Sequence, residues 1–233
     1  MRALVTGASR GIGRAIALEI APDCRSLVLV SRTKDLMEQL QDEIKQKNPN
    51  CTVLIQDYDA TDLETVQYYF AQIMEKLGGL DVLVNCAGKA IPPRAVQEIS
   101  LKTWNEIFAV NATLPFLMTK AAIPAMRNSP SPAIVNIAST AGLTPRPGWS
   151  AYAASKASLV NFSETMAAEL KPYGIKVHCV APGRTATELR RILAPDEDPK
   201  TIMQPNAVAR VVRFLITDQG HVLQGQAIVV RGD

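Results

Sequence analysis

Short runs of apolar and β-branched residues alternate with longer amphipathic stretches from one end of the chain to the other. This alternation is typical of βαβ units built around a parallel sheet. The expected strands cover residues 2–6, 26–31, 51–56, 81–84, 133–138, 175–181 and 226–230. The expected helices cover residues 11–21, 34–47, 62–77, 101–127, 149–170 and 206–217. Because several strands are apolar on both faces, the pattern predicts one doubly wound α/β domain over residues 1–233, with about seven parallel strands and helices on both faces.

Composition narrows the class of protein. The 233 residues include 25 Lys and Arg against 22 Asp and Glu, a net charge of +3 that is far from the basic footprint of a nucleic-acid-binding protein. Two histidines and four widely spaced cysteines without a C-x-x-C pair favour neither a metal site nor a disulfide framework, and indicate reduced cysteines in a cytoplasmic protein. The strand-like start at Arg2 and apolar runs well below the roughly 20 residues of a membrane span predict neither a signal peptide nor a membrane protein.

A glycine-rich turn follows the first expected strand and leads directly into a helix. It reads Thr6-Gly-Ala-Ser-Arg-Gly-Ile-Gly13. Glycines at such a turn let the backbone approach a pyrophosphate, and the helix N-terminus offers free N–H groups and a favourable dipole. The turn therefore predicts a Rossmann-type dinucleotide site that uses Gly7, Ser9, Arg10, Gly11, Ile12 and Gly13. A glycine-rich turn without a ligand is the alternative.

The end of the second strand bears on the choice of dinucleotide. An acid there binds the ribose 2′-hydroxyl of NAD and repels the 2′-phosphate of NADP. This strand instead ends in Ser31 and Arg32, and Arg32 together with Arg10 of the glycine turn could flank a phosphate. We therefore expect NADP(H), with two ordinary solvated arginines as the alternative.

Four polar residues point to catalysis. Tyr152 and Lys156 lie four apart on an expected helix, where a nearby ammonium would lower the pKa of the phenol. An exposed surface pair is the alternative for this spacing taken alone. Ser139 lies thirteen residues before Tyr152 at the carboxyl end of an expected strand, where ligands bind to a parallel sheet. An ordinary serine in a turn is the alternative. Asn111 interrupts a helical segment, where its side chain is locally unfavourable.

Together these segments resemble the short-chain dehydrogenase/reductase family, whose pattern is T-G-x-x-x-G-x-G, N-N-A-G, a Ser and Y-x-x-x-K. Here the second motif reads Asn85-Cys-Ala-Gly88, with Cys86 at the second Asn position. The resemblance implies that Ser139 orients a substrate carbonyl, Tyr152 is the general acid, and Lys156 binds the ribose and tunes Tyr152. It also implies that Asn111 kinks a long helix and holds a water that joins the lysine to solvent.

The same resemblance assigns further cofactor contacts. It implies that Asp59 and Ala60 border the adenine, with a plain helix N-cap at Thr61 or Asp62 as the competing explanation. It implies that the nicotinamide carboxamide meets the turn Pro182-Gly-Arg-Thr-Ala-Thr187, in which Thr185 replaces the usual aliphatic residue. The implied cofactor-binding residues beyond the glycine turn are Ser31, Arg32, Asp59, Ala60, Asn85, Ala87, Gly88, Tyr152, Lys156, Pro182, Gly183, Thr185 and Thr187.

The expected function is therefore NADPH-dependent reduction of a ketone or aldehyde to an alcohol, or the reverse. A 3-oxoacyl carrier-protein reductase shares every motif, and a redox-sensing NADPH-binding protein without turnover is a more remote alternative. Arg184, Arg190 and Arg191 form a local positive group, either a solvated helix face or a site for an anionic or carrier-bound substrate. The segment 185–205 is expected to border the substrate. The resemblance also implies a dimer or tetramer through the helix at 206–217 and the last strand.

Overall fold

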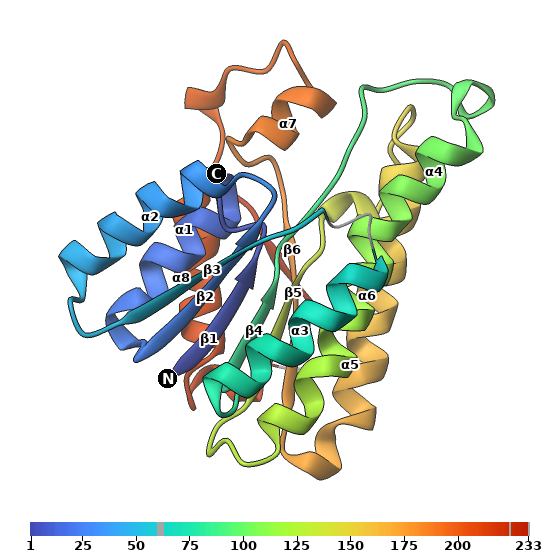
Figure 1. Ribbon diagram of the computed structural model, residues 1–233. Coiled ribbons are helices and arrows are strands. Elements are labelled where there is room, and N and C mark those ends of the chain that lie inside the picture. The colour runs from blue at the N-terminus through green and yellow to red at the C-terminus, as the bar shows by residue number, and fades with distance from the viewer. Residues whose placement is uncertain (60–62, 224, 233) are drawn as a thin grey trace.

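Seven parallel strands form one sheet in the computed structural model, which describes residues 1–59, 63–223 and 225–232 (Figure 1). The strands are β1 (Arg2–Thr6), β2 (Ser26–Ser31), β3 (Thr52–Asp57), β4 (Val82–Asn85), β5 (Ala133–Ile137), β6 (Lys176–Pro182) and β7 (Ala227–Val230). Their order across the sheet is β3-β2-β1-β4-β5-β6-β7, and every neighbouring pair is parallel. The expected parallel sheet is confirmed, with strand limits that differ from the expected ones by at most one residue at either end.

Helices connect successive strands. The α-helices are α1 (Gly11–Ile20), α2 (Lys34–Lys47), α3 (Leu63–Leu77), α4 (Leu101–Phe108), α5 (Leu114–Met126), α6 (Ser150–Glu169), α7 (Glu188–Leu193) and α8 (Pro205–Leu215). Shorter helical turns are η1 (Ala21–Asp23), η2 (Val96–Glu98), η3 (Ala109–Thr113), η4 (Thr140–Gly142), η5 (Lys171–Tyr173), η6 (Pro199–Thr201) and η7 (Gly220–Val222). Each expected helix is present except that the one expected at 101–127 is divided into α4, η3 and α5.

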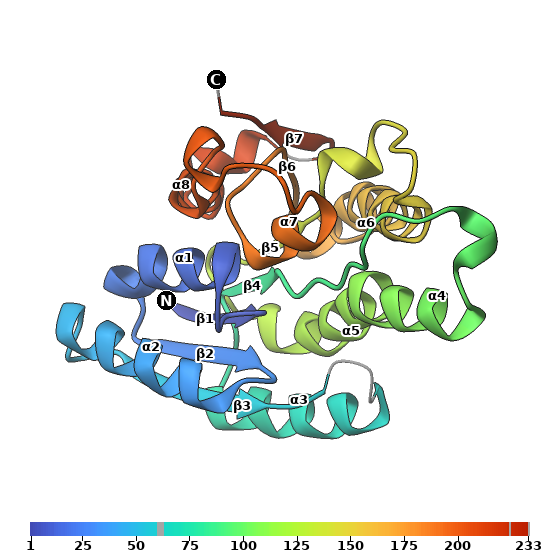
Figure 2. The same cartoon turned by 90° about the horizontal axis from the view of Figure 1, so that it is seen from above.

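The helices cover the sheet from both sides, as Figure 2 shows. Successive strand residues point to opposite faces, so Ala3 and Val5 pack with α1, α2 and α8, whereas Leu4 packs with α3, α5 and α6. Leu4, Leu27, Leu29 and Leu83 are fully buried. Burial on both faces explains why the strands are continuously apolar and confirms the expected two-layer cover.

The helical run Leu101–Met126 is long and apolar enough to cross a membrane by length and composition alone. Half of its most apolar window is buried inside the protein, and Leu114, Met118 and Ala122 pack against the sheet. These contacts are those of a core helix, and a core helix can have the same length and apolar composition as a membrane span.

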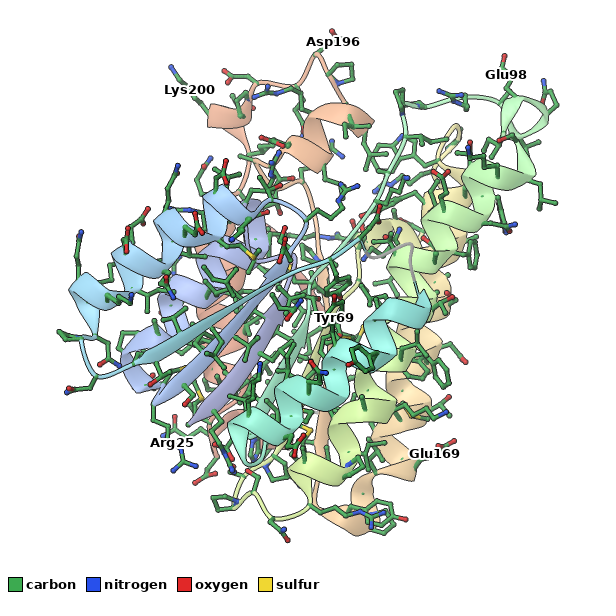
Figure 3. The ribbon with its side chains drawn as sticks, viewed as in Figure 1. Arg25, Tyr69, Glu98, Glu169, Asp196 and Lys200 are labelled. Carbon is green, nitrogen blue, oxygen red and sulfur yellow. The ribbon has the colours of Figure 1, made fainter. Side chains whose placement is uncertain are left out.

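All strands point their carboxyl ends toward the same edge of the sheet, at the top of Figure 1. Two segments project beyond that edge: Glu98 marks the one before α4, and Asp196 and Lys200 mark the one after α7 (Figure 3). Helix α7 was not among the expected helices, and it packs through Leu189 and Leu193 against Tyr152 and Trp149. Ala60, expected to border the adenine, lies outside the described residues.

Candidate active site

The glycine turn between β1 and α1 can be built only from glycine at two points. Gly7 has φ +67°, and a Cβ there would lie 2.9 Å from backbone atoms of Ala87. A Cβ on Gly13 would lie 2.2 Å from the carbonyl oxygen of Gly7, well inside van der Waals contact. The turn therefore brings the N-terminus of α1 close to the end of β4 and leaves its backbone exposed to a ligand.

Thr6 joins the ends of β1 and β4, the two strands on either side of the point where the strand order reverses. Its hydroxyl oxygen accepts hydrogen bonds from the backbone N–H groups of Cys86 (3.0 Å) and Ala87 (3.1 Å). Thr6 is itself buried. In open parallel sheets, ligands bind in the crevice at this reversal, so Thr6 fixes both walls of the expected site.

A cleft of about 430 Å³ opens at this crevice. Its volume lies within the range of small-molecule and cofactor sites. Its lining includes most of the residues expected to bind the dinucleotide: Gly7, Ser9, Arg10, Gly11, Ile12, Gly13, Ser31, Arg32, Asp59, Ala87, Gly88, Tyr152, Lys156 and Thr187. The close-fitting glycine turn, the open helix N-terminus and this volume together fit a dinucleotide.

Polar groups near the end of β2 are organised for recognition at one side of the cleft. The hydroxyl oxygens of Ser9 and Ser31 lie 2.7 Å apart and hydrogen-bond each other. Arg10 forms an ion pair with Glu188, the first residue of α7. Arg32 is exposed and lines the cleft. The sequence did not indicate the Glu188 contact, because its two partners are far apart in the chain.

Among the described residues, four of the expected contacts do not line the cleft. Asn85 does not line the cleft, because its side chain is 2% exposed and its amide donates to Asn136 Oδ1 at 2.8 Å inside the sheet. The polar residue thus secures β4 to β5 beneath the site. Pro182, Gly183 and Thr185 line a second, adjoining cavity of about 230 Å³.

Tyr152 and Ser139 meet where the two cavities adjoin. Tyr152 lines both of them, and Ser139 lines the second, close enough to the phenol to affect its pKa. Burial raises the pKa of Tyr152 above its ordinary value, although Ser139 and the charge of Arg190 act in the opposite direction. In the protein alone burial outweighs the charges around the phenol, so the pKa of Tyr152 lies above its ordinary value rather than below it, as the Tyr152–Lys156 spacing had suggested.

Lys156 lies one turn beyond Tyr152 and is 3% exposed. Its ammonium donates to the carbonyl oxygen of Ile137 at 2.8 Å, at the carboxyl end of β5. Burial lowers the pKa of Lys156 from 10.5 to about 8, with Cys86 and Cys179 opposing the shift. The low-dielectric floor of the cleft therefore favours the neutral forms of both the phenol and the amine.

Asn111 lies in η3, a single π-helical turn, and is fully buried. Its amide donates to the carbonyl oxygen of Lys89 and to Ser155 Oγ, both at 2.9 Å, and its Oδ1 accepts from the Lys89 N–H at 2.7 Å. Ser155 in turn donates to the carbonyl oxygen of Tyr152 at 2.8 Å. Asn111 thus joins the segment after β4 to the turn of α6 that carries Tyr152 and Lys156. Helix interruptions of this kind recur at functional sites.

The second cavity is lined by Ser139 and Tyr152, and also by Ile12 of the glycine turn and Thr187 before α7. Thr187 donates to the carbonyl oxygen of Thr185 at 3.3 Å and accepts from the Arg190 N–H at 3.1 Å, so it caps α7. The sequence missed Leu189, which lines both cavities, and Lys89, which lines the first. The Thr187 cap followed by apolar residues at 189 and 193 is the signal that could have revealed α7.

Among the described residues, no three His, Cys, Asp or Glu side chains lie in a group that could hold a metal ion.

Comparison with known proteins agrees with this geometry. A family model described as short chain dehydrogenase matches residues 1–198. The human protein named dehydrogenase/reductase SDR family member 4 is 31% identical, over 99% of this chain and 86% of its own length. Two solved structures are similar over almost the whole chain. A 3-ketoacyl-(acyl-carrier-protein) reductase from Brucella melitensis complexed with NADH has a TM-score of 0.87 and 28% identity, covering 98% of this chain and 95% of its own. A short chain dehydrogenase from Burkholderia cenocepacia in complex with NADP has a TM-score of 0.89 and 28% identity, covering 99% and 96%.

Replacement of Lys156 by Met tests its buried charge. Since the folded-state pKa of about 8 lies below the ordinary 10.5, the unfolded chain binds more protons between these values, and the free energy of unfolding of the wild type rises with pH there. We expect the stability of Lys156→Met relative to the wild type to be greater at pH 7 than at pH 10, by about 2 kcal/mol. Chemical denaturation of both proteins at the two pH values measures this difference. A difference that is independent of pH would contradict the assigned pKa.

Proposed function

The chain belongs to the short chain dehydrogenase family and is an oxidoreductase, and we propose that it reduces a ketone or aldehyde to an alcohol with NADPH, or catalyses the reverse reaction. The observation that carries the proposal is the position of Tyr152, which lines both the cleft that fits a dinucleotide and the adjoining second cavity. A proton donor at that junction can reach a substrate oxygen while the carbonyl carbon faces the cofactor. A bound nicotinamide dinucleotide supplies the hydride.

The residues around the junction have separate tasks in this proposal. Ser139 donates to the substrate oxygen and orients the carbonyl, in the manner of an oxyanion-stabilising group. Tyr152 delivers the proton that converts the developing alkoxide into an alcohol, and its raised pKa keeps the phenol protonated in the reducing direction. Lys156 contributes positive charge beneath the cleft, and Asn111 fixes the turn of α6 through Ser155.

The preference for NADPH is supported by charge. Arg10 and Arg32 line the cleft beside the end of β2, and that strand ends in Ser31 rather than in an acid. A guanidinium fork suits a phosphate monoester. The relatives include one structure with NADP and one with NADH, so the choice depends on the local charges of this chain.

A second candidate is reduction of a 3-oxoacyl group held on a carrier protein, which the similarity to the Brucella melitensis reductase favours. Rates that depend on the carrier protein, compared with the free thioester, would distinguish it from a carbonyl reductase of small molecules. A protein that only binds NADPH would not oxidise it when any carbonyl compound is added. The presence of both Ser139 and Tyr152 beside the cleft argues against this alternative.

We also propose that the chain forms a dimer or tetramer through α8 and β7. Phe214, Val222, Leu223 and Val229 are exposed apolar residues of this region. An interface between copies of the chain would bury these apolar side chains. Light scattering at low micromolar concentration should give the mass of an oligomer, and a monomer would contradict the proposal.

Replacement of Tyr152 by Phe tests the proton donor. We expect kcat to fall roughly 100- to 10,000-fold, because the ring stays and only the acid is lost. NADPH binding, followed by the fluorescence of the cofactor, should stay within about twofold, since general acid catalysis contributes to the rate rather than to ground-state binding. Tyr68→Phe, at an exposed tyrosine of α3, is the matched control and should keep the wild-type rate. Near-normal turnover by Tyr152→Phe would exclude this assignment.

Two changes test the selection of NADPH. Arg32→Asp should lower kcat/KM for NADPH roughly 100-fold and leave NADH within a few-fold, because a charge that attracts the 2′-phosphate becomes one that repels it. Glu188→Gln should improve NADPH binding by up to about fivefold, because it frees Arg10 from an exposed ion pair. Glu43→Gln, which removes the partner of Arg14 outside the cleft, is the control. Equal use of both cofactors by the wild type, or an unchanged preference in Arg32→Asp, would contradict the proposal.

A further inference from the structure

The second cavity is lined by three arginines and by no carboxylate among the described residues. Arg146 comes from the segment between η4 and α6, Arg184 from the turn after β6, and Arg190 from α7. Ser139 and Tyr152 line the same cavity. Three distant segments therefore bring positive charge to the space that holds the proton donor. The positive group expected from the sequence was Arg184, Arg190 and Arg191, but Arg191 is exposed and does not line the cavity, whereas Arg146 does.

Arg190 is held in a fixed position. Its guanidinium donates two hydrogen bonds to the Glu197 carboxylate, at 2.5 and 2.8 Å, and lies 5.5 Å above the ring centre of Trp149. Trp149 meets the ring of Tyr152 edge-on, with 6.3 Å between the ring centres. The conformation of Arg190 is therefore set by the protein before any ligand binds. The charge of Arg190 lowers the pKa of the Tyr152 phenol, against the effect of burial.

The positive charge of the cavity is only partly neutralised. Glu197 also lies 3.4 Å from Arg184, so a single carboxylate serves two guanidinium groups. The hydrogen bond and charge of Arg190, together with the charge of Arg184, lower the pKa of Glu197 despite its burial, and it stays ionised at neutral pH. Arg146 is exposed and forms no ion pair within the described part of the chain. Arg146 and Arg184 therefore leave positive charge available to a ligand.

The cavity is small as well as positive. Its volume of about 230 Å³ lies below the usual range for drug-sized ligands, and its remaining walls include Trp149, Leu189 and Leu193. Pro182, Gly183 and Thr185, which are expected to meet the nicotinamide, line the same cavity. The space left beside the nicotinamide therefore suits a compact molecule with a short carbon skeleton. Charge-assisted hydrogen bonds to an oxyanion are the strong contacts that guanidinium groups make.

From this arrangement we infer that the substrate is a small carbonyl compound that carries an anionic group, held by Arg146 and Arg184 while its carbonyl oxygen meets Ser139 and Tyr152. The inference rests on the proposed carbonyl reduction and names its substrate class. In the reaction the carbonyl carbon gains a hydride and the oxygen gains the Tyr152 proton, so that the carbonyl becomes a secondary or primary alcohol. The reduced dinucleotide loses two electrons, and the anionic group is unchanged.

Two matched pairs of compounds separate the anionic group from the carbonyl. Acetoacetate is compared with methyl acetoacetate, and dihydroxyacetone phosphate with dihydroxyacetone. The first pair tests a carboxylate and the second a phosphate ester. We expect one anionic member to have a kcat/KM at least tenfold above that of its neutral partner, as NADPH oxidation measures.

Variants assign that preference to residues. Arg146→Gln and Arg184→Gln should each raise KM for the preferred anion roughly tenfold and leave the neutral partner within about twofold, because each removes one charge-assisted contact. Arg191→Gln, on the exposed side of α7, should change neither. Thermal melting of each variant checks that the fold is intact. Equal kcat/KM values for charged and neutral partners, or equal effects of all three variants, would overturn the inference and leave the proposed carbonyl reduction standing.

Binding without turnover separates the two proposals. The chain has two tryptophans, so Trp104→Phe leaves Trp149, beside Arg190 and Tyr152, as the only one. In this variant, acetoacetate or dihydroxyacetone phosphate should change the Trp149 fluorescence saturably, their neutral partners should not, and Arg184→Gln should weaken the effect roughly tenfold. If no carbonyl compound is reduced but the anion still binds in this way, the proposed function fails and the anion site remains. If neither anion binds more tightly than its neutral partner, the inference fails whatever the turnover.

Discussion

Every part of the candidate site depends on one constraint: all seven strands are parallel, so their carboxyl ends lie along one edge of the sheet. The chain builds β1 to β3 in one direction and β4 to β7 in the other, and the reversal between β1 and β4 opens a crevice that no side chain of the sheet has to fill. Thr6 bridges this reversal by accepting two backbone hydrogen bonds from the end of β4. Segments that follow different strands meet at this edge of the sheet because the strands all end there. They are the glycine turn after β1, the residues after β2, and Ser139 after β5, with α6 beyond it.

Burial at the floor of the crevice then determines its electrostatics. The phenol of Tyr152 and the amine of Lys156 are both shifted toward their neutral forms, since little water reaches either group. A neutral phenol is the form that can donate a proton to a reduced carbonyl. The positive charge that does reach Tyr152 comes from Arg190, which Glu197 and Trp149 hold on the side of the second cavity. Positive charge thus reaches the phenol from the second cavity, while Lys156 lies buried beneath the cleft.

The sequence predicts the frame of the molecule better than its contacts between distant segments. The periodicity of strands and helices is a local property of the sequence, and the spacing of the glycines indicates the turn that they form. The sheet and the position of the cleft could therefore be predicted from the sequence. Asn85 could not, because only the pairing of β4 with β5 turns its amide toward Asn136 and away from the cleft. Helix α7 and the inclusion of Arg146 in the second cavity likewise depend on packing between segments far apart in the chain. The direction of the Tyr152 pKa shift depends on burial, which spacing alone does not give.

The central claim is that hydride transfer and protonation meet at the junction that Tyr152 lines. Reduction of a ketone by NADPH in which both hydrogens at C4 of the nicotinamide are replaced by deuterium tests it most directly. The account predicts an alcohol that holds one deuterium on its carbinol carbon, as mass spectrometry would detect, and loss of that product in Tyr152→Phe. Carbinol that contains only hydrogen from solvent, or labelled product formed equally by Tyr152→Phe, would contradict it.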